Sequence, residues 1–462
     1  MDNLMDINAY FQRWLREYIM IHHDPVIIEY SGIYKYLKAF FRDNYLVFII
    51  QSFFLSGRTN TFQDYLDNLK VNEIVNDGNR FLLDNHINQL LGTIEFYKSS
   101  FPDLQNLEIL GDIHLGLVSK VLVTTSNGSN IYYQSTTSES LIRDIFVGFN
   151  GYFENNLPKF YPYDKLVKRE YIQTNLKAVT QTQVKNYFFQ IGELIPYFLA
   201  IKGYDLNYEN VLTSIPYPVF FDYECAFLPE LKASFGDYSI NFTGISSDDE
   251  QDDFSVLMGA NKTRISYLIP ILHYDDLNPK LTWTVPSKKQ PIHTPIFNGV
   301  PVHSPNYLEE LLDGYNSSMK TIIYNKYKLM EKIYSGDLRV RIILRPTRVY
   351  AGLIKKIMLQ LSVDPKSSIR KTVLHYFNFH QIPYLGDFSN ILVNYEIDCI
   401  QKGIIPYFYV NIKDKTVYSS DGLIVGSLQN SAYEVWYKFF VNIEDFLEKQ
   451  KQLLTKNLDT NI

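Results

Sequence analysis

Two neighbouring stretches decide the fold of this chain: Gly203-Tyr-Asp-Leu-Asn-Tyr-Glu-Asn210 and Pro218-Val-Phe-Phe-Asp-Tyr-Glu224. The first follows residues 186–200, whose apolar positions recur with a helical period, and its opening glycine is well placed to end a helix. The second is a short apolar run that ends in two acidic residues, as a buried strand does before a loop. The two stretches therefore predict a helix, a polar loop and a strand with carboxylates at its end.

The polar residues of these stretches have the spacing of a phosphate-transfer site. Asp205 and Asn210 are separated like the Asp and Asn of a kinase catalytic loop, and Asp222 ends a strand as a metal-binding Asp of a kinase does. Magnesium takes oxygen ligands from one or two protein groups and the rest from phosphate and water. An Asp beside a hydroxyl can take its proton. Ordinary turn residues after a helix are the alternative interpretation.

A kinase also places a lysine on a hairpin strand against the nucleotide phosphates. Residues 118–124 and 131–136 are β-rich and flank Ser126-Asn127-Gly128, so they predict a hairpin. The second strand has Gln134 at the expected position, and no glycine-rich phosphate loop occurs in the sequence. The residues alone support a phosphotransfer fold but do not identify the group that binds the nucleotide phosphates.

The rest of the chain is patterned as a folded protein with much helix. Helical periodicity covers residues 5–100 and 307–334, and residues 339–344 favour a strand. The proline-rich residues 285–305 predict an irregular segment. The hydrophobic fraction of 46% in 462 residues is enough for a large core.

Composition excludes several classes of protein. The net charge of −6 argues against a nucleic-acid-binding protein, whose binding surface would be basic. Two cysteines provide neither a disulfide framework nor a cysteine zinc cluster, which fits a reducing cytoplasm. The N-terminus does not have the pattern of a signal peptide, and the longest apolar run, residues 45–55, is too short to span a membrane. We therefore expect a cytoplasmic protein.

Several motifs, in order, resemble the N-terminal dehydratase domain of the LanM-type (class II) lanthipeptide synthetases. The resemblance covers roughly residues 105–410 and rests on Gly111-Asp-Ile-His-Leu-Gly116, the following hairpin, Tyr187-Phe-Phe-Gln-Ile-Gly192, the two opening stretches, Arg341-Ile-Ile-Leu-Arg-Pro-Thr347 with Tyr350, and Gly403-Ile-Ile-Pro-Tyr-Phe408. The fold it implies is α+β, with a bilobal lipid-kinase-like core, a helical N-terminal region and additional helical elements. The corresponding division is a helical region at 1–103, an N-lobe with the elimination motif at 104–200 and a C-lobe at 201–462.

The resemblance implies a two-step activity. Members of the family use ATP and Mg²⁺ to phosphorylate Ser and Thr of a leader-bearing precursor peptide and then eliminate the phosphate, which leaves dehydroalanine or dehydrobutyrine. A zinc cyclase normally follows. The present chain ends at Ile462 without the Cys and His ligands of a cyclase, so we expect a stand-alone dehydratase. A separate cyclase or other modification enzymes are then further candidate partners beside the precursor peptide.

Individual residues follow the family pattern unevenly. The elimination side matches at Asp112, His114, Arg341 and Thr347, and the phosphorylation side at Asp205, Asn210, Asp222 and Glu224. We expect Asn210, Asp222 and Glu224 to hold the metal, and the remaining five to be catalytic. Two positions depart from the family, because Gln134 replaces a lysine and Asn207 replaces a histidine. These two, with Arg345, are the expected cofactor-binding positions.

The chemistry of elimination agrees with these residue types. A guanidinium stabilises a departing phosphate, so Arg341 is the first candidate and Arg345 the second. A histidine such as His114 can act as acid or base, and a threonine hydroxyl such as that of Thr347 can donate a hydrogen bond. Two alternatives stay open: a phosphopeptide lyase without kinase activity, and a pseudokinase-like protein that only binds the precursor peptide.

Overall fold

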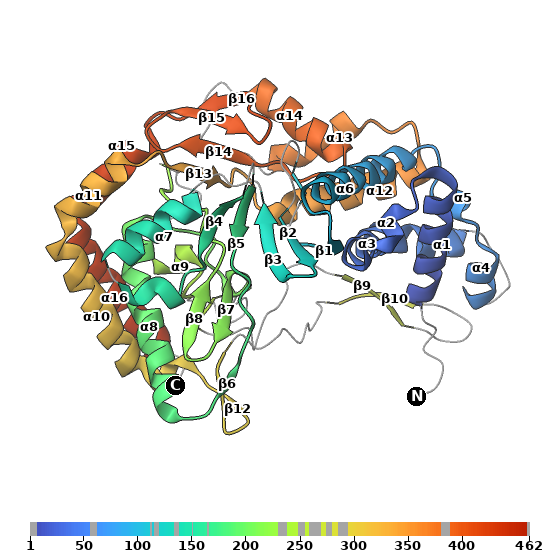
Figure 1. The fold of residues 1–462 in the computed structure, drawn as a ribbon. Coiled ribbons are helices and arrows are strands. Elements are labelled where there is room, and N and C mark those ends of the chain that lie inside the picture. The colour runs from blue at the N-terminus through green and yellow to red at the C-terminus, as the bar shows by residue number, and fades with distance from the viewer. Residues whose placement is uncertain are drawn as a thin grey trace.

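A computed structural model provides the structure of the chain. It describes residues 7–55, 62–110, 113–114, 120–133, 138–149, 151–163, 166–229, 238–247, 255–257, 269–273, 280–284, 294–379 and 389–459. The described part mixes helices with small, mostly antiparallel sheets. In Figure 1 the N-terminal helices lie on one side, a group of later helices lies on the other, and a small sheet stands between them.

The N-terminal region is helical, as predicted. It comprises α1 (Ile7–His22), α2 (Val26–Glu29), α3 (Ser31–Leu55), α4 (Phe62–Asn68), α5 (Val71–Ile74) and α6 (Arg80–Ser100). In α6 the side chains of Leu83, Ile87, Leu90 and Ile94 recur every three or four residues, and all four are buried. This spacing places them on one helix face, which packs into the core of the N-terminal region.

A five-stranded antiparallel sheet follows. Its strands are β1 (Leu104–Ile109), β2 (Val121–Thr125), β3 (Gly128–Tyr133), β4 (Phe160–Tyr163) and β5 (Leu166–Arg169), in the order β1-β2-β3-β5-β4. The β2–β3 hairpin confirms the predicted hairpin, and Gly128 adopts the positive φ of 111° that its turn requires. Residues 118–119 and 134–136 of the predicted strands lie outside the described residues.

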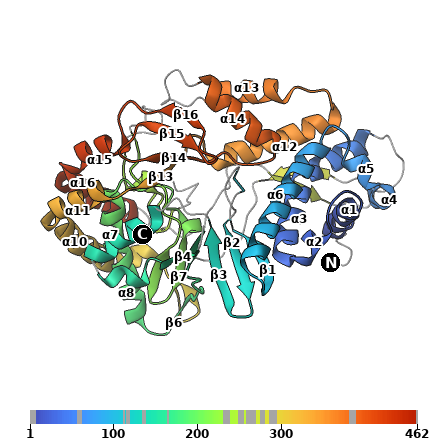
Figure 2. The same cartoon turned by 45° about the horizontal axis from the view of Figure 1, so that its top comes forward.

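The two faces of this sheet have different surroundings. Val121, Val123 and Tyr132 belong to the core of the N-terminal helices. Cross-strand pairing places Leu122 opposite Ile131 and Ile131 opposite Arg169, so these three side chains share the other face. Figure 2 shows the N-terminal helices on one side of β1–β3 and the later helices on the other.

A second hydrophobic core lies on that other side. Around it are α7 (Ser138–Phe149), α8 (Gln181–Ala200), α9 (Ile240–Thr243), α10 (Leu308–Tyr324), α11 (Lys326–Ser335), α15 (Ala432–Phe440), α16 (Ile443–Asp459), β6 (Lys177–Ala178), β7 (Val211–Ser214), β8 (Tyr217–Phe220), β11 (Ile296–Phe297), β12 (Val300–Pro301) and 3-10 helices at Gly151–Asn155, Tyr208–Asn210 and Ser304–Tyr307. The predicted helices at 186–200 and 307–334 are confirmed by α8, α10 and α11. Helices α8 and α10 approach closely at two glycines. Gly192 of α8 lies against the backbone of α10, and Gly314 of α10 lies against the backbone of α8, so a Cβ at either position would collide with the other helix.

A third group of elements connects the two sides. It consists of β13 (Arg339–Ile342), α12 (Thr347–Val363), α13 (Ile369–Phe379), α14 (Ser389–Gln401), β14 (Phe408–Asn411), β15 (Thr416–Ser419) and β16 (Ile424–Ser427). The strands form a sheet in the order β13-β14-β15-β16 and pack with the second core, while α12 packs on α3 in the first. The group therefore spans both sides, as Figures 1 and 2 show.

The segment at 285–305 corrects one prediction. An irregular segment was expected from its prolines, but residues 296–301 form the short hairpin of β11 and β12. Pro301 is compatible with this hairpin because β12 is an edge strand, where a missing N–H costs no internal hydrogen bond. Residues 285–293 lie outside the described part of the chain. A separate hairpin pairs β9 (Ile269–His273) with β10 (Lys280–Thr284).

The described helices also bear on the predicted absence of a membrane span. None of them combines the length and the apolar character needed to cross a bilayer.

Candidate functional site

The loop after α8 holds Asp205 in an unusual backbone conformation. Tyr204 N–H donates to the Cys225 carbonyl over 3.0 Å, and Leu206 N–H donates to the Thr243 carbonyl over 2.7 Å. Between these anchors Asp205 has a φ of 61°, in the left-handed region that few residues other than glycine adopt. Strained backbone of this kind is concentrated at functional sites, so the loop geometry supports a functional role for Asp205.

Two asparagines hold the Asp205 region in place. Asn207 Nδ2 donates to Asp205 Oδ1 over 3.2 Å, and Asn210 Nδ2 donates to the Asp205 carbonyl over 2.7 Å. Burial raises the pKa of Asp205 to about 6, with Arg341 opposing the rise and Asp222 adding to it. Asp205 is therefore mainly ionised at neutral pH and is basic enough to accept a proton.

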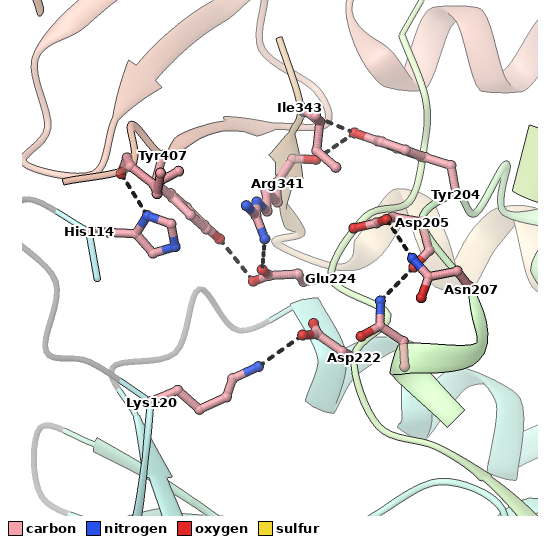
Figure 3. A network of polar contacts seen from close by, with 12 residues as sticks. His114, Lys120, Tyr204, Asp205, Asn207, Asp222, Glu224, Arg341, Ile343 and Tyr407 are labelled. Atoms are coloured by element: carbon pink, nitrogen blue, oxygen red, sulfur yellow. Dashed lines mark hydrogen bonds and ion pairs between the residues drawn. The ribbon is translucent and has the colours of Figure 1, made fainter. Parts of the chain in front are cut away.

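Asp222 lies just after β8 and pairs with a lysine. Its Oδ2 is 3.3 Å from Nζ of Lys120, the residue immediately before β2 (Figure 3). Burial raises the pKa of Asp222, but the nearby cations of Lys120, Arg341 and Arg169 outweigh burial and lower the pKa overall. Asp222 is therefore an ionised carboxylate, 27% exposed, that a cation can reach.

Glu224 connects this region to Arg341 of β13. Glu224 Oε1 is 3.0 Å from Arg341 Nη1, and Tyr407 donates its hydroxyl hydrogen to Oε2 over 2.9 Å. The Arg341 guanidinium also lies 5.0 Å from the centre of the Tyr407 ring. Tyr204 fixes the strand by donating its hydroxyl hydrogen to the Arg341 carbonyl over 2.9 Å. Figure 3 shows Arg341, Glu224 and Asp222 side by side.

His114 lies beside Tyr407, with 5.0 Å between the ring centres. Its Nδ1 is 2.8 Å from the Ile405 carbonyl oxygen. Because a carbonyl can only accept, Nδ1 carries the proton and Nε2 keeps a lone pair. Burial and, to a smaller extent, the charge of Arg341 together lower the pKa of His114 to about 3. The imidazole is therefore neutral at physiological pH, with a lone pair on Nε2 whose basicity is lowered by burial and by the charge of Arg341.

Thr347 and Arg345 follow β13 and differ in their surroundings. Thr347 is the first residue of α12, and it lines a small cavity together with Arg341 and Tyr350. A helix N-terminus and a threonine hydroxyl both suit an anion. The Arg345 side chain pairs instead with the fully buried Glu396, with 2.8 Å between Nε and Oε1, and stacks on Phe377. In this structure the charge of Arg345 is thus balanced by Glu396.

The structure therefore brings together most of the predicted site residues. His114, Asp205, Asp222, Glu224 and Arg341 belong to one region, as Figure 3 shows, with Asn207 beside Asp205. Asp112 and Gln134 lie outside the described residues. The roles assigned to all of these residues stay predictions.

Three charged residues of this region were missed by sequence reasoning: Lys120, Glu139 and Arg169. Glu139 lies in the first turn of α7 and is 3% exposed. Burial raises its pKa to about 7, with Lys120 opposing the rise. Arg169 of β5 is also 3% exposed, and its Nη1 donates to the Phe221 carbonyl. The alternation of side chains along the predicted strand at 118–124 could have identified Lys120, because it places this lysine on the sheet face opposite to that of Val121.

The donor set also limits the kind of metal site. Among the residues that the structure describes, no cluster of three or more His, Cys, Asp or Glu side chains is arranged to hold a metal ion. The predicted magnesium ligands are two carboxylates, Asp222 and Glu224, and the amide of Asn210. Asp222 and Asn210 suit a hard cation that keeps phosphate and water ligands, whereas both carboxylate oxygens of Glu224 are engaged by Arg341 and Tyr407.

Comparisons with known proteins match the part of the chain that contains this site. The chain is 23% identical over 358 residues to the lacticin 481/lactococcin biosynthesis protein LcnDR2 of Lactococcus lactis subsp. lactis, covering 69% of this chain and 37% of that protein. The chain thus spans little more than a third of the length of this relative. A family model described as "Domain of unknown function (DUF4135)" matches residues 82–411, a range that contains every predicted site residue. Because this match covers most of the chain, the chain belongs to the family described as "Domain of unknown function (DUF4135)".

Proposed function

We propose that this protein dehydrates Ser and Thr residues of a ribosomal precursor peptide, by phosphorylation with ATP and Mg²⁺ followed by elimination of the phosphate. The observation that carries the proposal is the Glu224 contact. Glu224 lies two residues after Asp222, on the phosphorylation side, and it binds Arg341, on the elimination side. The name of the Lactococcus relative, a lacticin 481/lactococcin biosynthesis protein, supports lanthipeptide modification as the context.

The proposal includes an organisation for the chain. The core is a bilobal, lipid-kinase-like fold, with a helical region at 1–103, an N-lobe at 104–200 and a C-lobe at 201–462. The protein is a cytoplasmic dehydratase. Its partners are the leader-bearing precursor peptide and a separate cyclase or other modification enzymes.

The residues around Asp222 fit a magnesium nucleotide. The Asn210 amide nitrogen is occupied by the Asp205 carbonyl, so its Oδ1 is the atom left for a cation. Asp222 is ionised and partly exposed. When bound, Mg²⁺-ATP supplies the γ-phosphoryl group and the charge that neutralises its transfer.

Phosphorylation needs a base for the hydroxyl proton, and Asp205 fits this role. As the peptide oxygen forms its bond to phosphorus, the Asp205 carboxylate takes the hydroxyl proton, and the bond to the ADP oxygen breaks. Asn207 donates to Asp205 Oδ1 and thereby leaves the other carboxylate oxygen for the proton. The pKa of about 6 keeps Asp205 ionised at neutral pH without making it a very weak base.

Elimination needs a base for the α-proton and a cation for the phosphate. The lone pair on His114 Nε2 takes the proton from the α-carbon, and the negative charge of the phosphate bound at Arg341 offsets the positive charge that helps to lower the His114 pKa. The electron pair of the C–H bond forms the new carbon–carbon double bond, and the bond from the β-carbon to the phosphate oxygen breaks. Arg341 binds the departing phosphate, and Thr347 at the start of α12 donates its hydroxyl hydrogen to it.

The test uses the purified chain and the precursor peptide encoded beside its gene. The peptide is incubated with ATP and Mg²⁺, and intact masses are recorded. Loss of water from the peptide is the expected result. No change in mass, with either the free peptide or a phosphoserine-containing version, would contradict an enzymatic function.

A phosphopeptide lyase without kinase activity is the second candidate. It is favoured by Gln134, which stands where the resembling family has its phosphate-binding lysine. In the same assay this candidate predicts elimination from the phosphoserine peptide and no reaction with the free peptide. Gain of phosphate by the free peptide would contradict it.

A further inference from the structure

Lys120 lies on the face of the five-stranded sheet that turns toward Asp222. The Lys120 carbonyl accepts a hydrogen bond from Leu110 N–H over 2.8 Å, so Lys120 continues the β1–β2 ladder. Side chains alternate along a strand, and the next residue, Val121, packs into the N-terminal core. Lys120 and Leu122 therefore point to the opposite face.

The same face carries a second cation. Leu122 pairs across the sheet with Ile131, and Ile131 pairs with Arg169, so Lys120 and Arg169 approach the Asp222 segment from one sheet face. Lys120 Nζ is 3.3 Å from Asp222 Oδ2, and Arg169 Nη1 donates to the carbonyl of Phe221, the preceding residue. Two strands of one sheet thus direct positive charge to the segment that contains Asp222.

The Lys120 side chain is partly open to solvent where it pairs with Asp222. The Lys120 side chain is 20% exposed, which leaves its ammonium group within reach of a ligand.

We propose that Lys120 is the phosphate-binding lysine of the nucleotide site, in place of the lysine that is absent at position 134. This inference rests on the proposed function. The ammonium group that now pairs with Asp222 binds nucleotide phosphate oxygens when Asp222 takes a metal ion. A lysine serves this purpose as a mobile point charge with three donors.

Nucleotide binding tests the inference without the peptide. The full-length protein is titrated with a fluorescent ATP analogue in the presence of Mg²⁺, as wild type and as Lys120→Gln. The expected result is a rise in Kd of about 10- to 100-fold, the factor that corresponds to a lost hydrogen bond to a charged group. Lys120→Arg should bind more tightly than Lys120→Gln, because it keeps the charge.

Lys168→Gln is the matched control. Lys168 is on β5, next to Arg169, and pairs with Tyr132, so it lies on the opposite face of the same sheet. Its substitution should leave Kd within about twofold of wild type, the range expected for a site that does not touch the ligand. Unchanged thermal unfolding of Lys120→Gln without nucleotide would show that the loss of binding is not a loss of folding.

The outcomes separate this inference from the proposed function. If wild type binds the analogue and Lys120→Gln binds equally well, the role of Lys120 is wrong while the dehydratase proposal stands. If wild type binds no nucleotide, the ATP-dependent function itself is wrong, and this inference with it. Retained elimination from a phosphoserine peptide by Lys120→Gln would confine the role of the lysine to the nucleotide step, as proposed.

Discussion

Replacing Arg341 by alanine should reduce both stability and elimination, because Arg341 balances the charge of Glu224. Removing one partner of a buried ion pair costs about 3–5 kcal/mol. The Arg341 and Glu224 side chains are 15% and 16% exposed, so some solvent reaches the remaining carboxylate. We therefore expect a loss at the lower end, about 3 kcal/mol, in the free energy of unfolding measured with urea.

A double-mutant cycle isolates the ion pair from other effects of Arg341. Glu224→Gln and the double variant Arg341→Ala/Glu224→Gln complete the cycle, and an interaction energy of about 1–3 kcal/mol is expected for side chains in direct contact. Arg339→Ala is the control on the same strand. Arg339 is exposed, so its loss should change stability by no more than about 0.5 kcal/mol.

The catalytic effect of Arg341→Ala is measured on two substrates. With a phosphoserine peptide, elimination should slow by about 100-fold or more, as expected when a preorganised donor to developing charge is lost. With the free peptide and ATP, the phosphorylated form should accumulate. Additive stability effects in the cycle, together with an unchanged elimination rate, would refute the role that we assign to Arg341.

Three further predictions concern single residues. Burial raises the pKa of Asp205 to about 6, so at lower pH its carboxyl group is protonated and cannot accept a proton. The phosphorylation rate should therefore fall as the pH drops through 6. A rate that stays constant from pH 5 to 8 would contradict Asp205 as the base. Burial lowers the pKa of His86, which stacks on Phe40, to about 4, so the unfolded state binds a proton at a higher pH than the folded state does. Between pH 6.5 and 4 the wild type should therefore lose up to about 3 kcal/mol of unfolding free energy. His86→Phe should not show this loss, and urea unfolding at several pH values measures the difference. Gly244 has a φ of 87°, and a Cβ added there would lie 3.0 Å from the Asn207 backbone nitrogen, so Gly244→Ala should slow phosphorylation. Gly422 has a similar φ of 84° but no atom near an added Cβ, so Gly422→Ala should cost only backbone strain of about 1–3 kcal/mol. Equal activities of the two variants in the peptide mass assay would contradict the contact with the Asp205 loop.

Local patterns in the sequence determined the elements that carry the site. The apolar period of residues 186–200 predicted α8, and the turn at Gly128 predicted the β2–β3 hairpin. These features depend on neighbouring residues only, since helix periodicity and turn conformation are local properties. The acidic end of the strand at Asp222 was visible for the same reason.

Other features depended on contacts between distant parts of the chain. Lys120 meets Asp222 across 102 positions of the sequence, and Arg341 meets Glu224 across 117. Sequence spacing gives no information about such pairs, because they form only when β2, β8 and β13 are packed together. Contacts between distant residues also lower the pKa of His114 and pair the Arg345 guanidinium with the Glu396 carboxylate.

The sequence by itself thus determined the helices, the hairpin and the residue types available for phosphate chemistry. The tertiary structure alone decided which of these charges neutralise one another. It put a lysine that the motif pattern had missed beside Asp222, and it joined Glu224 to Arg341. The physical reason is that charge pairing and burial are set by three-dimensional proximity, whereas secondary structure is largely set by the order of neighbouring residues.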